Sequence, residues 1–250
     1  MLGNWDRVLT STNLERLLIG DFLRTGELGG FSLTIALGVL AIFCSTILGV
    51  LTGLARQSNV KLLSYTASLY INLFRSIPVL VIIFWAYFLP YQIFGFSFSA
   101  FESALIALSL FTSAYIAEIV RSGLRSVSIQ HTKVARSLGF SRFQTYRYII
   151  LPQAIFVMLP ALAGRYIVTI KNTSLAFLIG LAEVTEVGRQ INSRLMTAPV
   201  EVYFVILMLY FSLNVLIGRA MALLESRARF NRIFSPAGTG SSGIGNTRSS

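Results

Sequence analysis

The residues with the clearest chemical potential are charged and polar side chains inside long apolar runs. Lys171 and Arg165 lie in one such run, and Lys171 opens the polar sequence KNTS at 171–174. A Lys or Arg at the centre of a bilayer costs about 2.5–3.5 kcal/mol on insertion scales, so it normally faces protein or a water-filled cavity. Polar breaks near that depth expose charge and backbone groups to small solutes. The sequence therefore predicts that Lys171, Asn172 and Ser174 line a solute pathway, with snorkelling of Lys171 to the outer interface as the alternative.

A second pair of charges, Arg75 and Glu118, lies at the ends of apolar runs. Charged side chains at such positions commonly anchor a helix at the membrane interface, and those at neighbouring helix ends also pair with each other. We favour this anchoring role, and a gate at the inner mouth of the pathway is the alternative.

Catalytic and metal-binding signatures are missing from the sequence. There is no G-x-x-x-x-G-K-[ST] loop for nucleotide phosphates and no H-E-x-x-H motif. The only histidine, His131, is far in sequence from the carboxylates of the apolar runs, so neither a Ser-His pair nor a metal site is supported. We predict no catalytic residue, no metal site and no cofactor in this chain.

The overall composition is that of a membrane protein. Hydrophobic residues make up 54% of the 250 residues and charged residues only 12%, whereas soluble domains carry about 25% charged residues. The mean hydropathy is +0.70. The excess apolar surface must face membrane lipid. The single cysteine, Cys44, excludes an intrachain disulfide.

The apolar runs predict an all-α integral membrane protein with about five transmembrane helices, since about 20 apolar residues cross a bilayer. The predicted spans are residues 31–55, 78–94, 103–120, 152–181 and 202–218. The sequence RSIP at 75–78 interrupts the second apolar stretch, because proline disfavours helix before it. We therefore expect residues 62–74 to form a helix near the cytoplasmic face, with the span itself starting at Pro78.

Two flanking segments differ from the membrane domain, which covers residues 31–225. Residues 1–30 have mixed charge and weak amphipathic character, which predicts a surface segment on the outer side. Residues 235–250 are rich in Ser and Gly and have no apolar periodicity, which predicts a disordered cytoplasmic tail.

The placement of Lys and Arg predicts the orientation of the chain. With the amino terminus outside, the inner segments 55–62, 121–147 and 219–250 hold thirteen of the 21 Lys and Arg residues, and the outer segments 1–30, 89–100 and 180–200 hold five. Loops rich in these residues stay in the cytoplasm, so we expect the amino terminus outside and the carboxyl terminus inside. Topology then explains the net charge of +11, and no nucleic-acid partner is expected.

The most polar internal segment, about residues 122–151, predicts a cytoplasmic helical hairpin. Gly139 suits the left-handed position that ends a first helix. Ser141 lies three residues before Gln144, which is the spacing of a capping box that starts a second helix. Pro152 begins the following span, where its missing N–H costs little. The alternative is a plain basic loop that only obeys the charge rule.

This segment resembles the EAA loop of the membrane subunits of ABC importers, whose pattern is E-A-A, three residues, G, nine residues and I-x-L-P. The matching positions here are Lys133, Val134, Ala135, Gly139, Ile149, Leu151 and Pro152. The sequences FRSIPVL at 74–80, AYIAEIVRSGLRS at 114–126, ILPQA at 150–154 and KNTSL at 171–175 are similar to the polar amino acid branch of that family. Together the matches cover roughly residues 30–225.

The resemblance implies a second permease subunit, identical or homologous, and two cytoplasmic ATPase subunits that each receive one hairpin. It also implies an extracytoplasmic substrate-binding protein, a place in a prokaryotic inner membrane, and ATP and Mg bound by the partner ATPase. In this framework the hairpin moves as a rigid lever. Gly139 forms the turn of the hairpin, and the small side chain of Ala135 permits close approach to the ATPase. Lys133 and Val134 replace the family's glutamate and first alanine, which changes the polarity of that contact and would fit a heteromeric permease pair.

We therefore predict a permease subunit of an ATP-driven importer for polar amino acids, a transport subunit that forms half of the translocation pathway and is not an enzyme. Asn172 replaces the family's usual aspartate beside Lys171, and the remaining positive charge favours acidic or neutral polar substrates such as glutamate, aspartate or glutamine. The alternatives are an importer of another small solute in the same family, such as a basic amino acid or an opine, and a non-ABC scaffold or channel whose hairpin binds anionic lipid.

Overall fold

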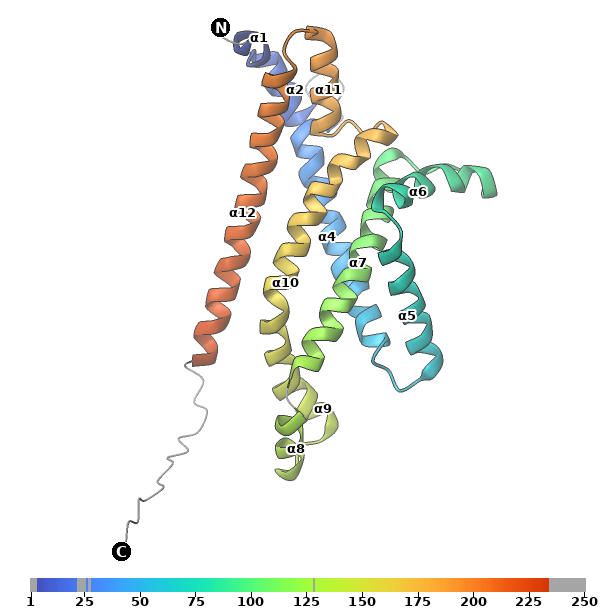
Figure 1. The fold of residues 1–250 in the computed structure, drawn as a ribbon, viewed down its shortest axis with the longest axis vertical. Helices are drawn as coiled ribbons and strands as arrows, with labels where there is room; N and C mark the ends of the chain where they lie inside the picture. The colour runs from blue at the N-terminus through green and yellow to red at the C-terminus, as the bar shows by residue number, and fades with distance from the viewer. Residues whose placement is uncertain (1–3, 22–25, 27, 128, 234–250) are drawn as a thin grey trace, which may run out of the picture.

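The computed structural model describes residues 4–21, 26, 28–127 and 129–233, and these are almost entirely helical (Figure 1). The predicted tail, residues 235–250, lies outside the described residues. In chain order the described helices are α1 (Trp5–Val8), α2 (Ser11–Ile19), α4 (Gly30–Ala55), α5 (Lys61–Ser76), α6 (Val79–Phe94), α7 (Ala100–Ser126), α8 (Ile129–Ser137), α9 (Arg142–Thr145), η1 (Tyr146–Ile150), α10 (Leu151–Asn172), η2 (Thr173–Ile179), α11 (Val184–Leu195) and α12 (Pro199–Ile233).

The predicted membrane fold is confirmed. Among the described residues, four helical stretches are long and apolar enough to cross a membrane, and the bent pair of α5 and α6 would add a fifth. The four stretches are Gly30–Ala55, Ala100–Ser126, Arg142–Ile179 and Pro199–Arg227. Figure 1 shows α4, α7, α10 and α12 along the long axis, with α8 and α9 at one end of the bundle and α1, α2 and α11 at the other.

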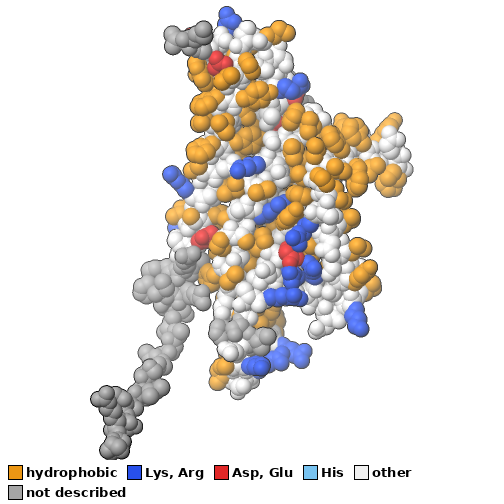
Figure 2. Space-filling model, viewed as in Figure 1, with side chains coloured by type: hydrophobic (Ala, Val, Ile, Leu, Met, Phe, Trp, Pro, Cys, Tyr) orange, Lys and Arg blue, Asp and Glu red, His pale blue; other side chains and the backbone are white. Residues whose placement is uncertain are grey.

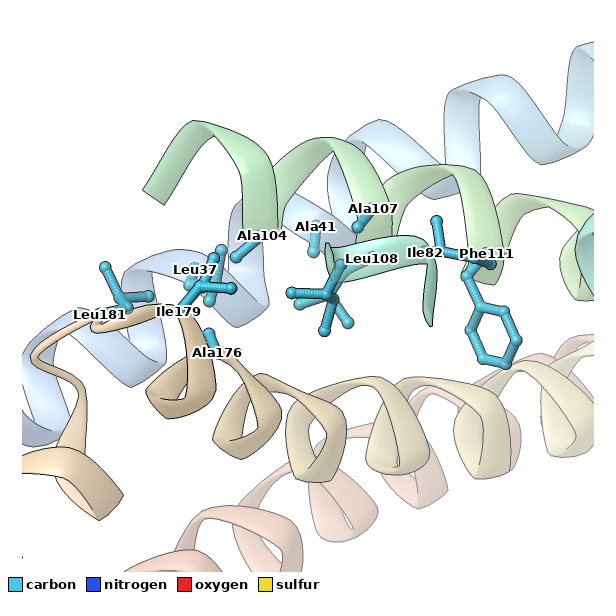
Figure 3. Close-up of a cluster of buried hydrophobic side chains, with 11 residues drawn as sticks. Leu37, Ala41, Ile82, Ala104, Ala107, Leu108, Phe111, Ala176, Ile179 and Leu181 are labelled. Atoms are coloured by element: carbon cyan, nitrogen blue, oxygen red, sulfur yellow. The ribbon is translucent and has the colours of Figure 1, made fainter. Parts of the chain in front are cut away.

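Helices α4 and α7 make the most extensive contact in the bundle, and small residues allow it. A Cβ added to Gly49 of α4 would come within 2.6 Å of the Ile116 Cβ of α7. In the neighbouring cluster of Figure 3, Ala41 of α4 and Ala104 and Ala107 of α7 pack with side chains from α6 and η2. Between lipid-embedded helices, such small residues let the backbones approach and gain van der Waals contact.

The broken second span differs in part from the prediction. The break is where the sequence placed it, because α5 ends at Ser76 and α6 begins after Pro78. However, α5 lies along α7, where the Tyr70 hydroxyl is 3.1 Å from the Leu110 carbonyl and 2.6 Å from Ser113 Oγ. The chain then bends by 104°, and α6 extends sideways from the bundle (Figure 1).

Residues 62–74, expected near the cytoplasmic face, therefore lie against α7, and the first part of α6 also packs into the core, where Ile82 and Ile83 are buried with residues of α4 and α7. Each half has 16 residues, which at about 1.5 Å per residue is too short to cross a bilayer alone. The 104° bend between the two halves is a tertiary feature that a local apolar pattern does not specify.

The segment between the last two spans also differs from the prediction. We treated residues 180–200 as an outer loop, but α11 lies there and packs against the amino-terminal helices. Val8 of α1 and Leu17 of α2 are fully buried in one cluster with Val184 and Ile191 of α11. The described part of residues 1–30 is therefore packed into this end of the bundle and is more than a surface segment.

Candidate functional site

The predicted pathway residues Lys171 and Ser174 line an open pocket between α10, η2 and α12. We call it the Lys171 pocket; its volume is about 370 Å³, and it is completed by Leu207, Tyr210, Phe211 and Asn214. The Lys171 side chain is exposed, and none of the ion pairs among the described residues includes it. An ammonium group in a largely apolar and aromatic pocket can bind and orient the carboxylate of a solute.

Asn172, the third predicted pathway residue, is not part of this lining. It ends α10, and from Thr173 the backbone adopts the tighter 3₁₀ geometry of η2. Ser174 Oγ donates a hydrogen bond to the Lys171 carbonyl at 2.8 Å. The polar break predicted at 171–174 is thus a change of helix type, a feature that often marks a functional hinge.

Tyr210 and Asn214 are candidate site residues that sequence reasoning missed. They lie four residues apart in α12 and therefore share one face of the helix. Their spacing inside the apolar run 202–218 is the signal that could have found them. Asn214 Nδ2 donates to the Tyr210 carbonyl at 2.7 Å, whereas its Oδ1 is buried and has no hydrogen-bond partner within the described residues. The wall of the Lys171 pocket therefore contains an unsatisfied hydrogen-bond acceptor.

A buried carboxylate, Glu183, lies behind Tyr210, in the connection between the last two spans. The Tyr210 hydroxyl donates to Glu183 Oε2 at 3.0 Å, and Thr34 Oγ1 of α4 is 3.4 Å from the same oxygen. Glu183 also caps α11 by accepting from the N–H groups of Thr185 and Glu186 at 3.0 and 3.1 Å. Burial raises the pKa of Glu183 to about 7, although these hydrogen bonds act in the opposite direction.

Arg75 and Glu118 belong to one group of charges on the hairpin half of the bundle, which we call the Glu118 cluster. Arg56 Nη1, just after α4, is 2.5 Å from Glu118 Oε2, and Arg75 Nη1 of α5 is 3.6 Å from the same oxygen. Arg121 Nε donates to Glu118 Oε1 at 3.0 Å. One carboxylate therefore joins three arginine residues and ties the ends of α4 and α5 to α7.

The predicted hairpin has the expected local structure. Gly139 adopts a φ of +86° between α8 and α9. The N–H groups of Gly139 and Phe140 return to carbonyl groups of α8 at 3.0 and 3.1 Å, which is the pattern of a glycine-ended helix. Ser141 and Gln144 form the reciprocal capping box that starts α9. Figure 1 shows this hairpin projecting beyond the end of the bundle.

The tip of the hairpin combines apolar and cationic side chains. The exposed residues are Lys133, Val134, Arg136, Leu138, Phe140, Arg142 and Phe143. Exposed large apolar side chains at a projecting tip indicate a docking surface for another protein. Ala135, by contrast, is only 2% exposed. It packs inside the hairpin and does not offer the close approach to a partner surface that we expected of it.

The second helix of the hairpin continues into the bundle without a break. The π-helical turn η1 links α9 to α10, with the Leu151 N–H donating to the Tyr146 carbonyl. This wider turn lies directly before Pro152, whose ring and missing N–H do not fit a regular α-helical turn. Ile149, Leu151 and Pro152 are half-buried. They belong to the connection between tip and bundle rather than to the tip.

Comparison with known proteins identifies the family. Residues 45–230 match the family described as binding-protein-dependent transport system inner membrane component. The chain belongs to this family. It is an ABC importer permease of the polar amino acid type, a multi-pass inner-membrane transport component and not an enzyme. The alternative of a non-ABC scaffold or channel is thereby excluded.

Individual relatives agree with this assignment. The chain is 43% identical over 166 residues to the probable amino-acid ABC transporter permease protein YckA of Bacillus subtilis, covering 66% of this chain and 73% of that protein. It is 34% identical over 204 residues to the glutamate transport system permease protein GluD of Corynebacterium glutamicum, covering 79% and 75%. Its fold is similar to a crystal structure of an amino acid ABC transporter with histidines, with a TM-score of 0.74, 34% identity and coverage of 79% and 92%.

Proposed function

We propose that this permease forms half of the translocation pathway for acidic or neutral polar amino acids, with glutamate, aspartate and glutamine as the leading substrates. The observation that carries the proposal is the Lys171 pocket, whose lining includes an ammonium without an ion-pair partner among the described residues and the amide of Asn214, with its unsatisfied Oδ1. An α-amino acid offers the matching carboxylate and ammonium groups. Lys171 would repel a cationic side chain, so the pocket disfavours basic amino acids. The similarity to a glutamate permease supports the same class.

We further infer that the hairpin couples this pathway to a cytoplasmic ATPase. Its exposed apolar and cationic tip fits a protein surface with apolar and acidic groups. Because α9, η1 and α10 form one continuous helical stretch, a displacement of the tip would be transmitted along α10 toward Lys171. The coupling residues at the tip would be Lys133, Val134 and Gly139. Those at the point where this helical stretch enters the bundle would be Ile149, Leu151 and Pro152.

The proposed assembly contains a second permease subunit, ATPase subunits that bind ATP and Mg, and an extracytoplasmic substrate-binding protein. The open side of the Lys171 pocket leaves room for a second subunit to complete the pathway. The excess of Lys and Arg at the hairpin end supports an amino terminus outside and a carboxyl terminus in the cytoplasm.

The coupling role is tested by comparing Gly139→Val with Gly95→Val. Both glycines have a left-handed φ, +86° and +74°, and a Cβ at either would meet no atom within 4 Å, so the backbone strain is matched. The tagged chain is purified in mild detergent with its partners and reconstituted with the binding protein. We expect Gly139→Val to lose the co-purifying ATPase and ATP-driven amino acid uptake, while Gly95→Val keeps both. Normal uptake by Gly139→Val would contradict the coupling role.

A further inference from the structure

Arg165 of α10 lies inside the bundle without an anionic partner among the described residues. Its guanidinium carbon is 3.9 Å from the ring centroid of Tyr115 and 4.8 Å from that of Phe111, both on α7. Its Nε and Nη2 atoms are buried and have no hydrogen-bond partner in the described part of the chain. Aromatic rings attract the cation but do not saturate its five N–H donors. Part of the hydrogen-bonding capacity of this guanidinium is therefore unused within the described chain.

A second guanidinium, that of Arg75 on α5, approaches the same ring. Its carbon is 5.4 Å from the Tyr115 centroid. The carboxylate nearest to Arg75 is Glu118 at 3.6 Å, and Glu118 is engaged more closely by Arg56 at 2.5 Å. The Arg75 side chain is 40% exposed. Two like charges that share one ring repel each other, and an anion placed between them would relieve that repulsion.

The surroundings of these two residues are also strongly positive. Figure 2 shows Lys and Arg side chains gathered across the middle of one face, over α10 and α7, with little acidic surface among them. Arg56, Arg75 and Arg121 pair with the single carboxylate of Glu118, whereas Lys171 and Arg165 belong to none of the ion pairs of the described residues. A surface lined by one sign of charge raises the local concentration of the opposite ion.

We propose that Arg165 and Arg75, brought together on the ring of Tyr115, form a second binding station for the carboxylate of the transported solute. The inference rests on the proposed function and deepens it by assigning a specificity-determining residue, Arg165. A guanidinium holds a carboxylate by two parallel hydrogen bonds, whereas Lys171 offers a point charge. Arg165 precedes Lys171 by six residues on α10, about 9 Å along the helix.

The test measures equilibrium binding to the complete detergent-purified importer with two probes, L-glutamine and L-glutaminamide, in which a carboxamide replaces the carboxylate. The variants are Arg165→Gln and Arg165→Lys. The matched control is Arg125→Gln, which removes an exposed guanidinium near the end of α7. We expect the unmodified complex to bind glutamine about tenfold more tightly than the amide. Arg165→Gln should abolish that preference, Arg165→Lys should keep part of it, and the control should keep all of it.

The proposal is overturned if Arg165→Gln retains the full carboxylate preference, or if the unmodified complex binds neither probe. It is also overturned if Arg165→Gln separates the permease pair on size-exclusion chromatography while the preference persists, because the acceptor for Arg165 then belongs to the neighbouring subunit. A failure of the proposed transport function would be seen in a separate measurement. Proteoliposomes that contain the unmodified importer and are supplied with the binding protein and ATP would then take up no polar amino acid.

Discussion

The Glu118 cluster and the Lys171 pocket both place charge inside the bundle, but they use it in opposite ways. In the cluster, one carboxylate is shared by arginines from α5, α7 and the end of α4. In the pocket, Lys171 has no carboxylate partner among the described residues. Tyr210, which also lines the pocket, donates its hydroxyl hydrogen to the buried carboxylate of Glu183.

This difference separates charge that holds the structure together from charge that is available to a solute. The Glu118 carboxylate is satisfied within the chain and connects sequence-distant helix ends, which fits the anchoring role predicted for it. Lys171 must find its counter-ion elsewhere, which fits a pathway. The gate that we weighed for Arg75 and Glu118 would require the cluster to open during transport and stays a prediction.

The largest effect is expected from Glu118→Gln, which breaks the cluster and leaves its three arginines uncompensated. Removing one partner of a partly buried ion-pair network should lower the free energy of unfolding by about 3 kcal/mol. Thermal unfolding in detergent, followed by intrinsic fluorescence, measures it. Glu225→Gln removes a carboxylate of α12 that forms none of the ion pairs of the described residues, so it should change little. Equal losses in both variants would contradict the anchoring role.

Glu183→Gln tests the opposite situation, a carboxylate without a cation. The pKa of Glu183 is raised by burial to about 7 from an ordinary value of 4.5, so the folded chain binds more protons than the unfolded chain between these pH values. The stability of the unmodified protein should therefore fall as the pH rises from about 5 to about 7, by about 2 kcal/mol, and then level off. Melting temperatures measured from pH 5 to pH 8 should lose this slope in Glu183→Gln. An unchanged slope would assign the pH dependence to another group.

Lys171→Ala tests whether the Lys171 ammonium binds the solute or stabilises the fold. We expect uptake by reconstituted importer to fall about tenfold, equivalent to about 1.4 kcal/mol, because the carboxylate loses its ammonium partner. The melting temperature should stay the same, since no ion pair is broken. Lys61→Ala, at the exposed start of α5, is the matched control. Unchanged uptake by Lys171→Ala would return this residue to a snorkelling role.

The smallest effect is expected from Tyr210→Phe, which removes the hydroxyl that is bonded to Glu183 and keeps the ring. Loss of one hydrogen bond to a buried carboxylate should cost about 1 kcal/mol. Because the Tyr210 hydroxyl lowers the pKa of Glu183, that pKa should rise further in the variant. The pH at which stability levels off would then move upward, and a downward shift would contradict this account.

Several features followed directly from local sequence. Gly139 and the Ser141–Gln144 pair predicted the hairpin turn and its second helix, because a left-handed glycine and a capping box act within three or four residues. The proline at 78 predicted the break between α5 and α6 for the same local reason. The spacing from Lys133 to Pro152, together with the similarity of other segments, identified the family before the fold was known.

Other features required the folded chain. The partners of Glu118 include Arg56, 62 residues away, and Thr34 contacts Glu183 across 149 residues. Tyr70 is bonded to Leu110 and Ser113 of α7 across 40 and 43 residues, which holds α5 against α7.

Sequence by itself therefore determined the number of apolar helices, the place of the breaks and the shape of the hairpin. Only the tertiary structure decided which charges are paired, which have no partner, and how the two halves of the broken span bend and pack. The physical reason is the sequence separation over which each interaction acts. Helix caps, glycine turns and proline breaks act between residues a few positions apart. Ion pairs and buried hydrogen bonds join residues that meet only after the helices have packed.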